Sequence, residues 1–329
     1  MLNKMLLQLS HGNIDAIPNC DLNREMSQST LSVVIPTYYR NDRLVESISS
    51  VLNQDYTDIE IIVVDDSGEY HARDIVLEYD KPIEYVGLDE NKGAQIARNV
   101  GYEKASGDFI QFLDDDDRLL DNKLQQQADI LKNNPDIGVV YCGVRQEDTV
   151  SSPKTDLEGD VLKQSLMFDT WPCMYSTMLI RATVLDEIFP LDYLPGADDL
   201  DLIIQLAEVS KFAYVDQPLV LKRKSDNSRG RSVGAAMGRF KIINKNSNLF
   251  EKFPDKVKKS ALSDAYRSMG SALVRQNTWS KDAIICYIKS LYYHNGFSGM
   301  LVIETIVTLF GNPGWRLASS IQNKILSGR

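Results

Sequence analysis

This chain of 329 residues has few cysteines and histidines, and their spacing matches no common metal site. The four cysteines, Cys20, Cys142, Cys173 and Cys286, form no Cys-x-x-Cys pair. Neither a disulfide framework nor a zinc site is therefore predicted, and the reducing cytoplasm is the expected location. The three histidines are far apart and no Gly-x-Ser-x-Gly segment occurs, which argues against a hydrolase triad.

Long apolar runs and glycine-rich phosphate loops are also missing. The longest apolar stretch, Gly299 to Phe310, includes Glu304 and is too short for a spanning helix, which needs about 20 residues. The N-terminal residues are too polar for a signal peptide. Neither G-x-x-x-x-G-K-[ST] nor G-x-G-x-x-G follows a predicted strand, so a P-loop NTPase, a Rossmann dinucleotide enzyme and a sugar nucleotidyltransferase are all disfavoured.

Charge is abundant but unevenly distributed. The net charge of −10 comes from 36 basic and 46 acidic residues, which argues against a nucleic-acid partner. Residues 1–230 contain 21 basic and 41 acidic residues, a balance of −20, whereas residues 231–329 contain 15 and 5, a balance of +10. The basic region, with its apolar stretches, is expected to contact an anionic membrane surface on the cytoplasmic face, the acidic part of the chain or a second subunit of an oligomer.

The hydrophobic pattern predicts an α/β protein. Apolar runs at 31–36, 59–66, 83–87 and 108–113 indicate buried strands, and 41–52, 71–79 and 94–105 have helical periodicity. Alternating strands and helices indicate a doubly wound, mostly parallel sheet flanked by helices. We predict a loose arm over 1–30, a catalytic domain over 31–230 and a basic helical region over 231–329, with helices at 257–276 and 280–293.

Acidic residues follow the predicted strands at the edge where such sheets bind ligands. Asp65 and Asp66 follow the second strand, and Asp114 to Asp117 follow the fourth. Neighbouring carboxylates repel one another unless a cation lies between them. Oxygen ligands suit Mg²⁺ or Mn²⁺, so the pattern predicts a divalent metal that also contacts substrate phosphates. The alternative is a solvated acidic turn.

Five segments, SVVIPTYYR, EIIVVDDS, ENKGAQIARN, GDFIQFLDDDD and LPGADDLDL, occur in this order over residues 31–225. Together they resemble the family 2 glycosyltransferases, which have the GT-A fold. The resemblance implies inverting, metal-dependent and nonprocessive transfer of a sugar from a nucleoside-diphosphate sugar to a glycan or lipid-linked acceptor. UDP is the expected nucleotide, and Mg²⁺ or Mn²⁺ the expected cofactor. A catalytically silent nucleotide-sugar-binding or scaffold protein is the alternative.

The resemblance also assigns roles to individual residues. Asp114 and Asp116 would contact the metal, and Asp199 would be the catalytic base. The residues implied to bind the nucleotide are Pro36, Thr37, Tyr38, Asp66, Lys92, Gly93, Arg98, Asp114 and Asp115.

The acceptor and diphosphate positions are also implied by the resemblance. Trp171 and Asp198 would lie on the acceptor side. Many relatives have a histidine where this chain has Arg223 and Lys224, which suggests that these two cations meet the diphosphate. Two alternatives stay open. Asp198 and Asp199 would instead stabilise the start of a helix, since acidic residues in a first turn interact favourably with the helix dipole. Trp171 would instead pack in the core, as tryptophan often does.

Overall fold

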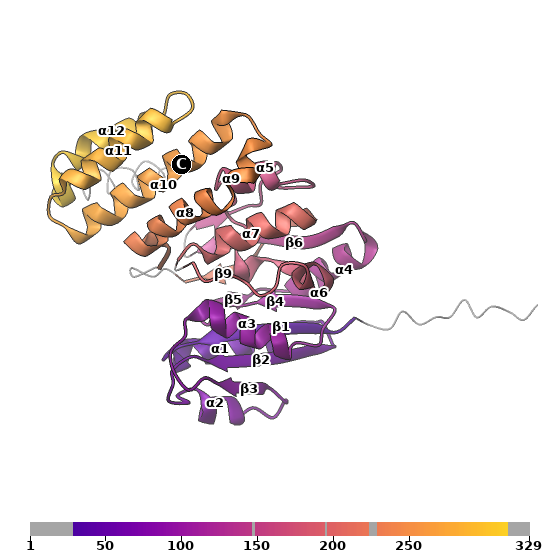
Figure 1. Ribbon diagram of the computed structural model, residues 1–329. Helices are drawn as coiled ribbons and strands as arrows, with labels where there is room; N and C mark the ends of the chain where they lie inside the picture. Colours follow the sequence, from indigo (N-terminus) through magenta and orange to yellow (C-terminus); the bar gives the residue numbers. More distant parts are fainter. Residues whose placement is uncertain (1–28, 147–148, 195, 224–228, 315–329) are drawn as a thin grey trace, which may run out of the picture.

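The computed structural model describes residues 29–146, 149–194, 196–223 and 229–314 (Figure 1). Most of the predicted N-terminal arm and residues 315–329 lie outside this part. The strands are β1 (Leu31–Thr37), β2 (Ile59–Asp65), β3 (Glu84–Gly87), β4 (Phe109–Phe112), β5 (Asp117–Leu119), β6 (Ile137–Gln146), β7 (Thr149–Ser151), β8 (Leu179–Arg181) and β9 (Lys211–Lys222). The helices and 3₁₀ turns are α1 (Asn41–Leu52), α2 (Arg73–Leu77), α3 (Ala94–Lys104), α4 (Lys123–Asn133), α5 (Leu162–Leu166), η1 (Tyr175–Thr177), α6 (Ala182–Asp186), α7 (Asp198–Val209), η2 (Arg229–Arg231), α8 (Val233–Lys245), α9 (Ser247–Glu251), α10 (Asp255–Gln276), α11 (Lys281–Tyr293) and α12 (Gly299–Thr308).

Within the described residues, nine strands form one sheet in the order β3-β2-β1-β4-β8-β6-β9-β5, with β7 paired to β6. Strands β3, β2, β1 and β4 are all parallel, and β6 pairs in parallel with β9. The antiparallel pairs involve the short strands β5, β7 and β8. The predicted α/β fold is confirmed, and the parallel half brings the carboxyl ends of its strands to one edge.

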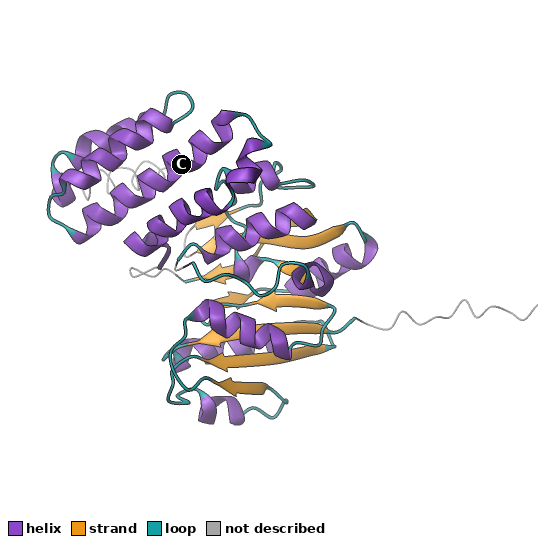
Figure 2. Cartoon of the chain, in the orientation of Figure 1, coloured by secondary structure: helices purple, strands orange, loops and turns teal. Residues whose placement is uncertain are grey.

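Helices cover both faces of the sheet (Figure 2), because its central strand is apolar on both. Strand β1 alternates its side chains between two cores, with Val33 and Ile35 in one and Val34 in the other. The first core includes residues of α1 and α4, and the second includes residues of α3 and α7. This double burial explains the uninterrupted apolar run seen in the sequence.

Helix α7 connects the sheet to the C-terminal helices. Its residues Leu202 and Leu206 pack in the sheet core, whereas Ile204 belongs to a third cluster with Ile242 of α8 and Val257 of α10. Helices α10, α11 and α12 then extend away from the sheet in Figure 1. None of the described helices is both long and apolar enough to cross a membrane.

A fully buried lysine lies near the carboxyl end of β4. The ammonium group of Lys123 donates hydrogen bonds to the side-chain oxygens of Gln111 and Gln127, the second at 2.6 Å. Both acceptors are neutral amides. The amide of Gln111 in turn donates to the carbonyl oxygens of Tyr175 and Ser176 at 3.2 and 3.1 Å, which ties η1 to β4. Burial lowers the pKa of Lys123 to about 8, because the charged form loses its hydration.

We expect this buried ammonium to make stability depend on pH. Below pH 8 the folded and unfolded states both carry the proton, so the burial penalty is fully present. Between about pH 8 and 10.5 the folded state releases the proton first and gains up to about 3 kcal/mol. Urea titrations at about pH 7 and 10.5 would compare the wild type with Lys123→Met. The unfolding free energy of the wild type, relative to that of the variant, should be higher at pH 10.5 than at pH 7. A difference that does not change with pH would contradict this account.

Candidate active site

The carboxyl ends of the parallel strands open into a cleft of about 490 Å³. Thr37 at the end of β1 lies opposite Asp65 at the end of β2, so the polar residues that follow both strands are neighbours. The cleft also reaches α7, the end of β9 and α8. The predicted site residues that line it are Pro36, Thr37, Tyr38, Asp66, Arg98, Asp114, Asp115, Asp116, Trp171, Asp198, Asp199 and Arg223.

Three of the four consecutive aspartates form a candidate metal site. Asp114, Asp116 and Asp117 each offer an oxygen, and these atoms lie within 4.8 Å of one another. The Oδ2 atom of Asp117 accepts a hydrogen bond from Ser176 at 2.7 Å, but its buried Oδ1 has no partner among the described residues. Burial, together with the neighbouring carboxylates and against the opposing effect of Lys222, raises the pKa of Asp117 to about 7. A divalent cation would satisfy the orphaned oxygen and remove the repulsion, so the residues fit such an ion.

Asp115 points away from this cluster toward β1. Its Oδ2 accepts a hydrogen bond from the Thr37 hydroxyl at 2.9 Å, and Arg40 donates to its Oδ1 at 2.9 Å. The Arg40 guanidinium also lies 3.1 Å from Asp116. The run therefore divides by side-chain direction, with Asp115 facing the end of β1 and the turn that follows it.

Asp66 binds the loop that contains Lys92 and Gly93. The backbone N–H groups of Lys92 and Gly93 donate to the two oxygens of Asp66 at 2.7 and 2.9 Å. Gly93 has a φ of +92°, and a Cβ there would lie 3.1 Å from the ring of Tyr193, so glycine is strongly favoured. The Lys92 ammonium is directed elsewhere, 3.9 Å from Glu90. Lys92 and Gly93 therefore lie beside the residues that line the cleft, and their backbone N–H groups fix the orientation of the Asp66 carboxylate.

Arg98 connects α3 to the acidic cluster. Its Nη2 atom lies 2.5 Å from Asp114 Oδ1, and its guanidinium stacks 3.7 Å from the ring centre of Tyr175. Tyr175 is held by a 2.6 Å hydrogen bond to Gln95 on α3. This arrangement places a buried positive charge directly behind a candidate metal ligand, where it offsets the negative charge of Asp114.

Asp199 lies in the first turn of α7 and lines the same cleft. Burial raises its pKa to about 6, and Asp114 contributes to the rise, while Arg98 and Lys222 oppose it. Asp198, one residue earlier, accepts a hydrogen bond from the backbone N–H of Leu194 at 2.8 Å. Asp199 is thus a half-buried carboxylate near the acidic cluster with a pKa suited to proton transfer near neutral pH.

The remaining predicted residues lie at the rim. The Trp171 side chain is 44% exposed, so its ring is available to a ligand rather than part of the core. Arg223 forms an ion pair with Glu46 of α1 and also lines the cleft. Lys224 lies outside the described residues.

Four residues near the acids were not in the predicted site, and one of them is Arg43, whose Nη1 lies 3.3 Å from Asp116 Oδ2. Lys222 is the cross-strand partner of Asp117 in the β5–β9 pair, and its Nζ lies 3.4 Å from Asp117 Oδ2. Arg40 pairs with Asp115 and Asp116. Asp117 had a signal in the acidic run itself, whereas Lys222 and Arg40 reach the acids only through the register of the sheet and the turn after β1.

Comparison with known proteins agrees with this geometry. Residues 32–189 match the family model described as glycosyl transferase family 2. An uncharacterised glycosyltransferase of Rickettsia typhi is 32% identical over 213 residues, which are 60% of this chain and 66% of that protein. The chain has a family 2 glycosyltransferase domain. Its predicted membership of that family is therefore confirmed.

Two further relatives of this glycosyltransferase domain are informative. The E. coli protein WfgD, named as a UDP-Glc:α-D-GlcNAc-diphosphoundecaprenol β-1,3-glucosyltransferase, is 41% identical over 111 residues, 33% of this chain and 44% of WfgD. The mannosyltransferase PcManGT of Pyrobaculum calidifontis, solved with GDP-Man and Mn²⁺, has a TM-score of 0.56 at 15% identity, with 91% of this chain and 88% of that chain covered. At this identity the likeness concerns the GT-A fold alone. The chain covers two thirds or less of the length of both sequence relatives.

Proposed function

We propose that this protein is an inverting, metal-dependent and nonprocessive glycosyltransferase of glycan biosynthesis. Its donor would be a nucleoside-diphosphate sugar and its acceptor a glycan or a lipid-linked glycan. The observation that carries the proposal is a single cleft lined both by Asp114 and Asp116 of the acidic cluster and by Asp199. A transferase needs these two parts in one place, because charge develops on the leaving diphosphate as the acceptor hydroxyl loses its proton.

The acidic cluster would hold the metal. Asp114, Asp116 and Asp117 offer only oxygen atoms, which suits Mg²⁺ or Mn²⁺. When bound, a divalent cation would offset the negative charge of the departing diphosphate. Arg98 and Lys222 lie beside the cluster and add positive charge on the protein side.

Asp199 would act as the base. In a single displacement, the acceptor oxygen forms a bond to the anomeric carbon as the bond from that carbon to the phosphate oxygen breaks, which inverts the configuration. The proton of the acceptor hydroxyl passes to a carboxylate oxygen of Asp199. Trp171 and Asp198 line the same cleft and would orient the acceptor, with the exposed Trp171 ring stacking on a sugar.

The donor would lie across the ends of β1, β2 and β4. Thr37, Tyr38, Asp66 and Asp115 line the cleft there and would bind the nucleoside, and Arg223 would reach the diphosphate by exchanging its Glu46 partner. UDP is the proposed nucleotide. The names of the relatives support a nucleoside-diphosphate donor, because WfgD is named for UDP-Glc and PcManGT was solved with GDP-Man.

A thermal-shift panel tests the donor. UDP-glucose, UDP-N-acetylglucosamine, UDP-galactose and GDP-mannose would each be added with Mn²⁺ or with EDTA. A true donor at 100 times its Kd should stabilise the protein by about 2.7 kcal/mol, and only with Mn²⁺. No metal-dependent shift with any donor would count against the proposal. A shift without release of nucleoside diphosphate on addition of acceptors would indicate the sugar-binding alternative.

A further inference from the structure

The hairpin of α11 and α12 has a concentration of exposed apolar side chains. On α11, Ile288 and Tyr292 are 55% and 80% exposed, and on α12, Ile303 and Ile306 are 50% and 51% exposed. Phe297, in the loop between the helices, is 89% exposed. Isolated exposed apolar residues are normal, but a cluster of this kind marks an interaction surface.

These residues lie on one side of each helix. Ile285, Ile288 and Tyr292 are spaced by three and four positions, and Met300, Ile303 and Ile306 by three, so each set occupies one helical face. We call these six residues the outer face. The opposite sides pack inward, with Tyr287 of α11 and Leu301 of α12 buried in one cluster. The outer face is therefore not needed to hold the helices together.

The charge around the outer face favours an anionic partner. Residues 233–314 contain 11 basic and 5 acidic residues, a balance of +6, although the hairpin itself is balanced, with Lys281 and Lys289 against Asp282 and Glu304. The excess lies on α8 to α10. Lys256, Lys258 and Lys259 of α10 are exposed, and the loop before α12 lies beside them, because Asn295 Nδ2 donates to the Lys256 carbonyl oxygen at 2.7 Å. Lys281 and Lys289 of α11 are exposed, while Glu304 of α12 is paired with Arg267 at 2.7 Å. An anionic lipid surface would complement the exposed lysines of α10 and α11 on either side of the hairpin loop.

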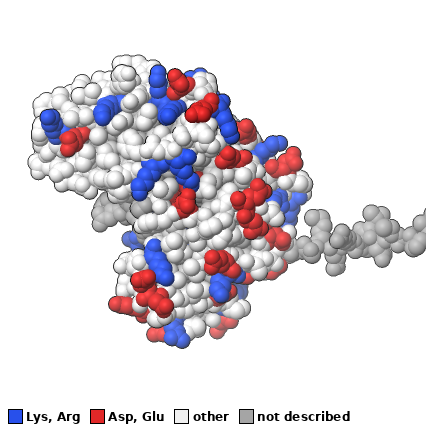
Figure 3. Space-filling view, viewed as in Figure 1, with Lys and Arg blue, Asp and Glu red and all other residues white. Residues whose placement is uncertain are grey.

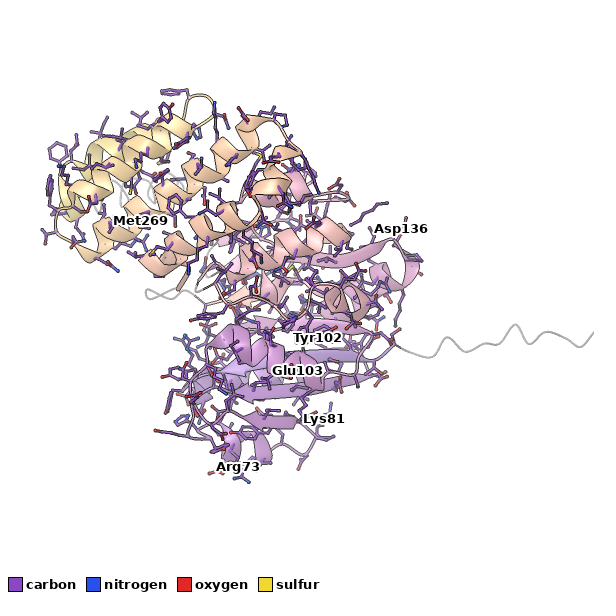
Figure 4. The ribbon with its side chains drawn as sticks, viewed as in Figure 1. Arg73, Lys81, Tyr102, Glu103, Asp136 and Met269 are labelled. Carbon is purple, nitrogen blue, oxygen red and sulfur yellow. The ribbon has the colours of Figure 1, made fainter. Side chains whose placement is uncertain are left out.

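The position of the hairpin also suits a surface contact. Side chains project outward from α11 and α12 along the edge of the molecule in Figure 4. In the space-filling view this end is mainly uncharged, with scattered basic and acidic groups (Figure 3). The same C-terminal region contributes Arg231 and Arg239 to the lining of the cleft, so the hairpin and the cleft belong to one connected set of helices.

We propose that the outer face binds anionic membranes, with α11 and α12 lying in the interface and Lys281 and Lys289 contacting lipid phosphates. The inference goes beyond the transfer reaction, because membrane binding needs no donor, metal or catalytic residue. It would bring the cleft to acceptors embedded in a bilayer.

Vesicle flotation of the full chain tests the inference. Vesicles of phosphatidylcholine alone and of phosphatidylcholine with phosphatidylglycerol would be compared at low and high salt. The wild type should float with the anionic vesicles and lose binding as salt is raised. Ile288→Ser/Ile303→Ser should weaken this binding at least about tenfold, and Lys281→Gln/Lys289→Gln by about tenfold.

The matched control is Leu77→Ser/Val150→Ser, since these apolar side chains are 64% and 58% exposed but lie away from the hairpin. It should bind vesicles as the wild type does. The inference is overturned if the wild type ignores anionic vesicles or if the outer-face variant binds them equally well. It is also overturned if light scattering shows an oligomer that this variant dissociates, because the face is then a protein interface. Donor binding in the thermal-shift panel stays a separate measurement, so failure here leaves the proposed function standing.

Discussion

Asp199→Asn is expected to lower the turnover of sugar transfer by about 10²–10⁴-fold with little change in donor affinity. Asparagine keeps the shape of the side chain but cannot accept the acceptor proton. Asp199 has a pKa raised to about 6, so in the free enzyme it is the ionised base above about pH 6 and is lost as the pH falls below that value. In the wild type the rate of sugar transfer should therefore fall as the pH drops below about 6. Because the charge of Asp114 contributes to the raised pKa of Asp199, metal binding at Asp114 should move this fall in rate to lower pH.

The matched control for this experiment is Asp136→Asn. The Asp136 side chain is 84% exposed, pairs with Lys211 at 3.7 Å and lies at the edge of the molecule in Figure 4. Such surface pairs contribute little to stability, so this variant should keep wild-type turnover. Initial rates with the donor identified by thermal shift, measured across pH for all three proteins, provide the comparison. Full turnover by Asp199→Asn would show that the base lies elsewhere.

Asp116→Asn and Asp117→Asn are each expected to weaken Mn²⁺ binding by about 100-fold or more, because each removes one charged ligand from the cluster. Comparing these two variants distinguishes a metal site of two aspartates from one of three. The resemblance implied Asp114 and Asp116 as the metal ligands, and the geometry adds Asp117, whose buried Oδ1 has no partner among the described residues. Loss of affinity in both variants supports the three-residue cluster.

Isothermal titration with Mn²⁺, with and without nucleoside diphosphate, measures this effect directly. Donor affinity in the presence of Mn²⁺ should fall together with metal affinity, because the two ligands are thermodynamically linked. Asp136→Asn again serves as the control. Wild-type metal affinity in Asp117→Asn would return the site to Asp114 and Asp116, and wild-type affinity in both variants would remove the cluster as the metal site.

The elements around the cleft could be predicted because their side-chain patterns are local. The run at 31–36 became β1, Leu31–Thr37, and the predicted helix at 257–276 became α10, Asp255–Gln276, each within two residues. A strand buried on both faces needs continuous apolar residues, and a helix packed on one side needs apolar residues at helical spacing. Parallel pairing then determines that the polar residues after β1 and the acids after β2 and β4 meet at one edge.

The directions of side chains within the site could not be predicted in this way. Consecutive residues in a turn have no fixed periodicity, so nothing in the run from Asp114 to Asp117 indicates that Asp115 faces Thr37 while the other three converge. The resemblance likewise implied that Lys92 binds the nucleotide, and nothing in the sequence indicates that its backbone N–H donates a hydrogen bond to Asp66. These outcomes depend on contacts between segments distant in the sequence.

The sequence by itself determined the fold class, the edge of the sheet where the acids gather, and the division of the chain into an acidic region and a shorter basic region. Each of these depends on composition or on local periodicity. Only the tertiary structure decided which acids face one another, that Lys222 is placed beside Asp117 by the β5–β9 register, and that the apolar residues of α11 and α12 divide into a packed and an exposed face. The physical reason is that a pattern sets which side of an element is apolar, whereas strand register and helix packing set what that side meets.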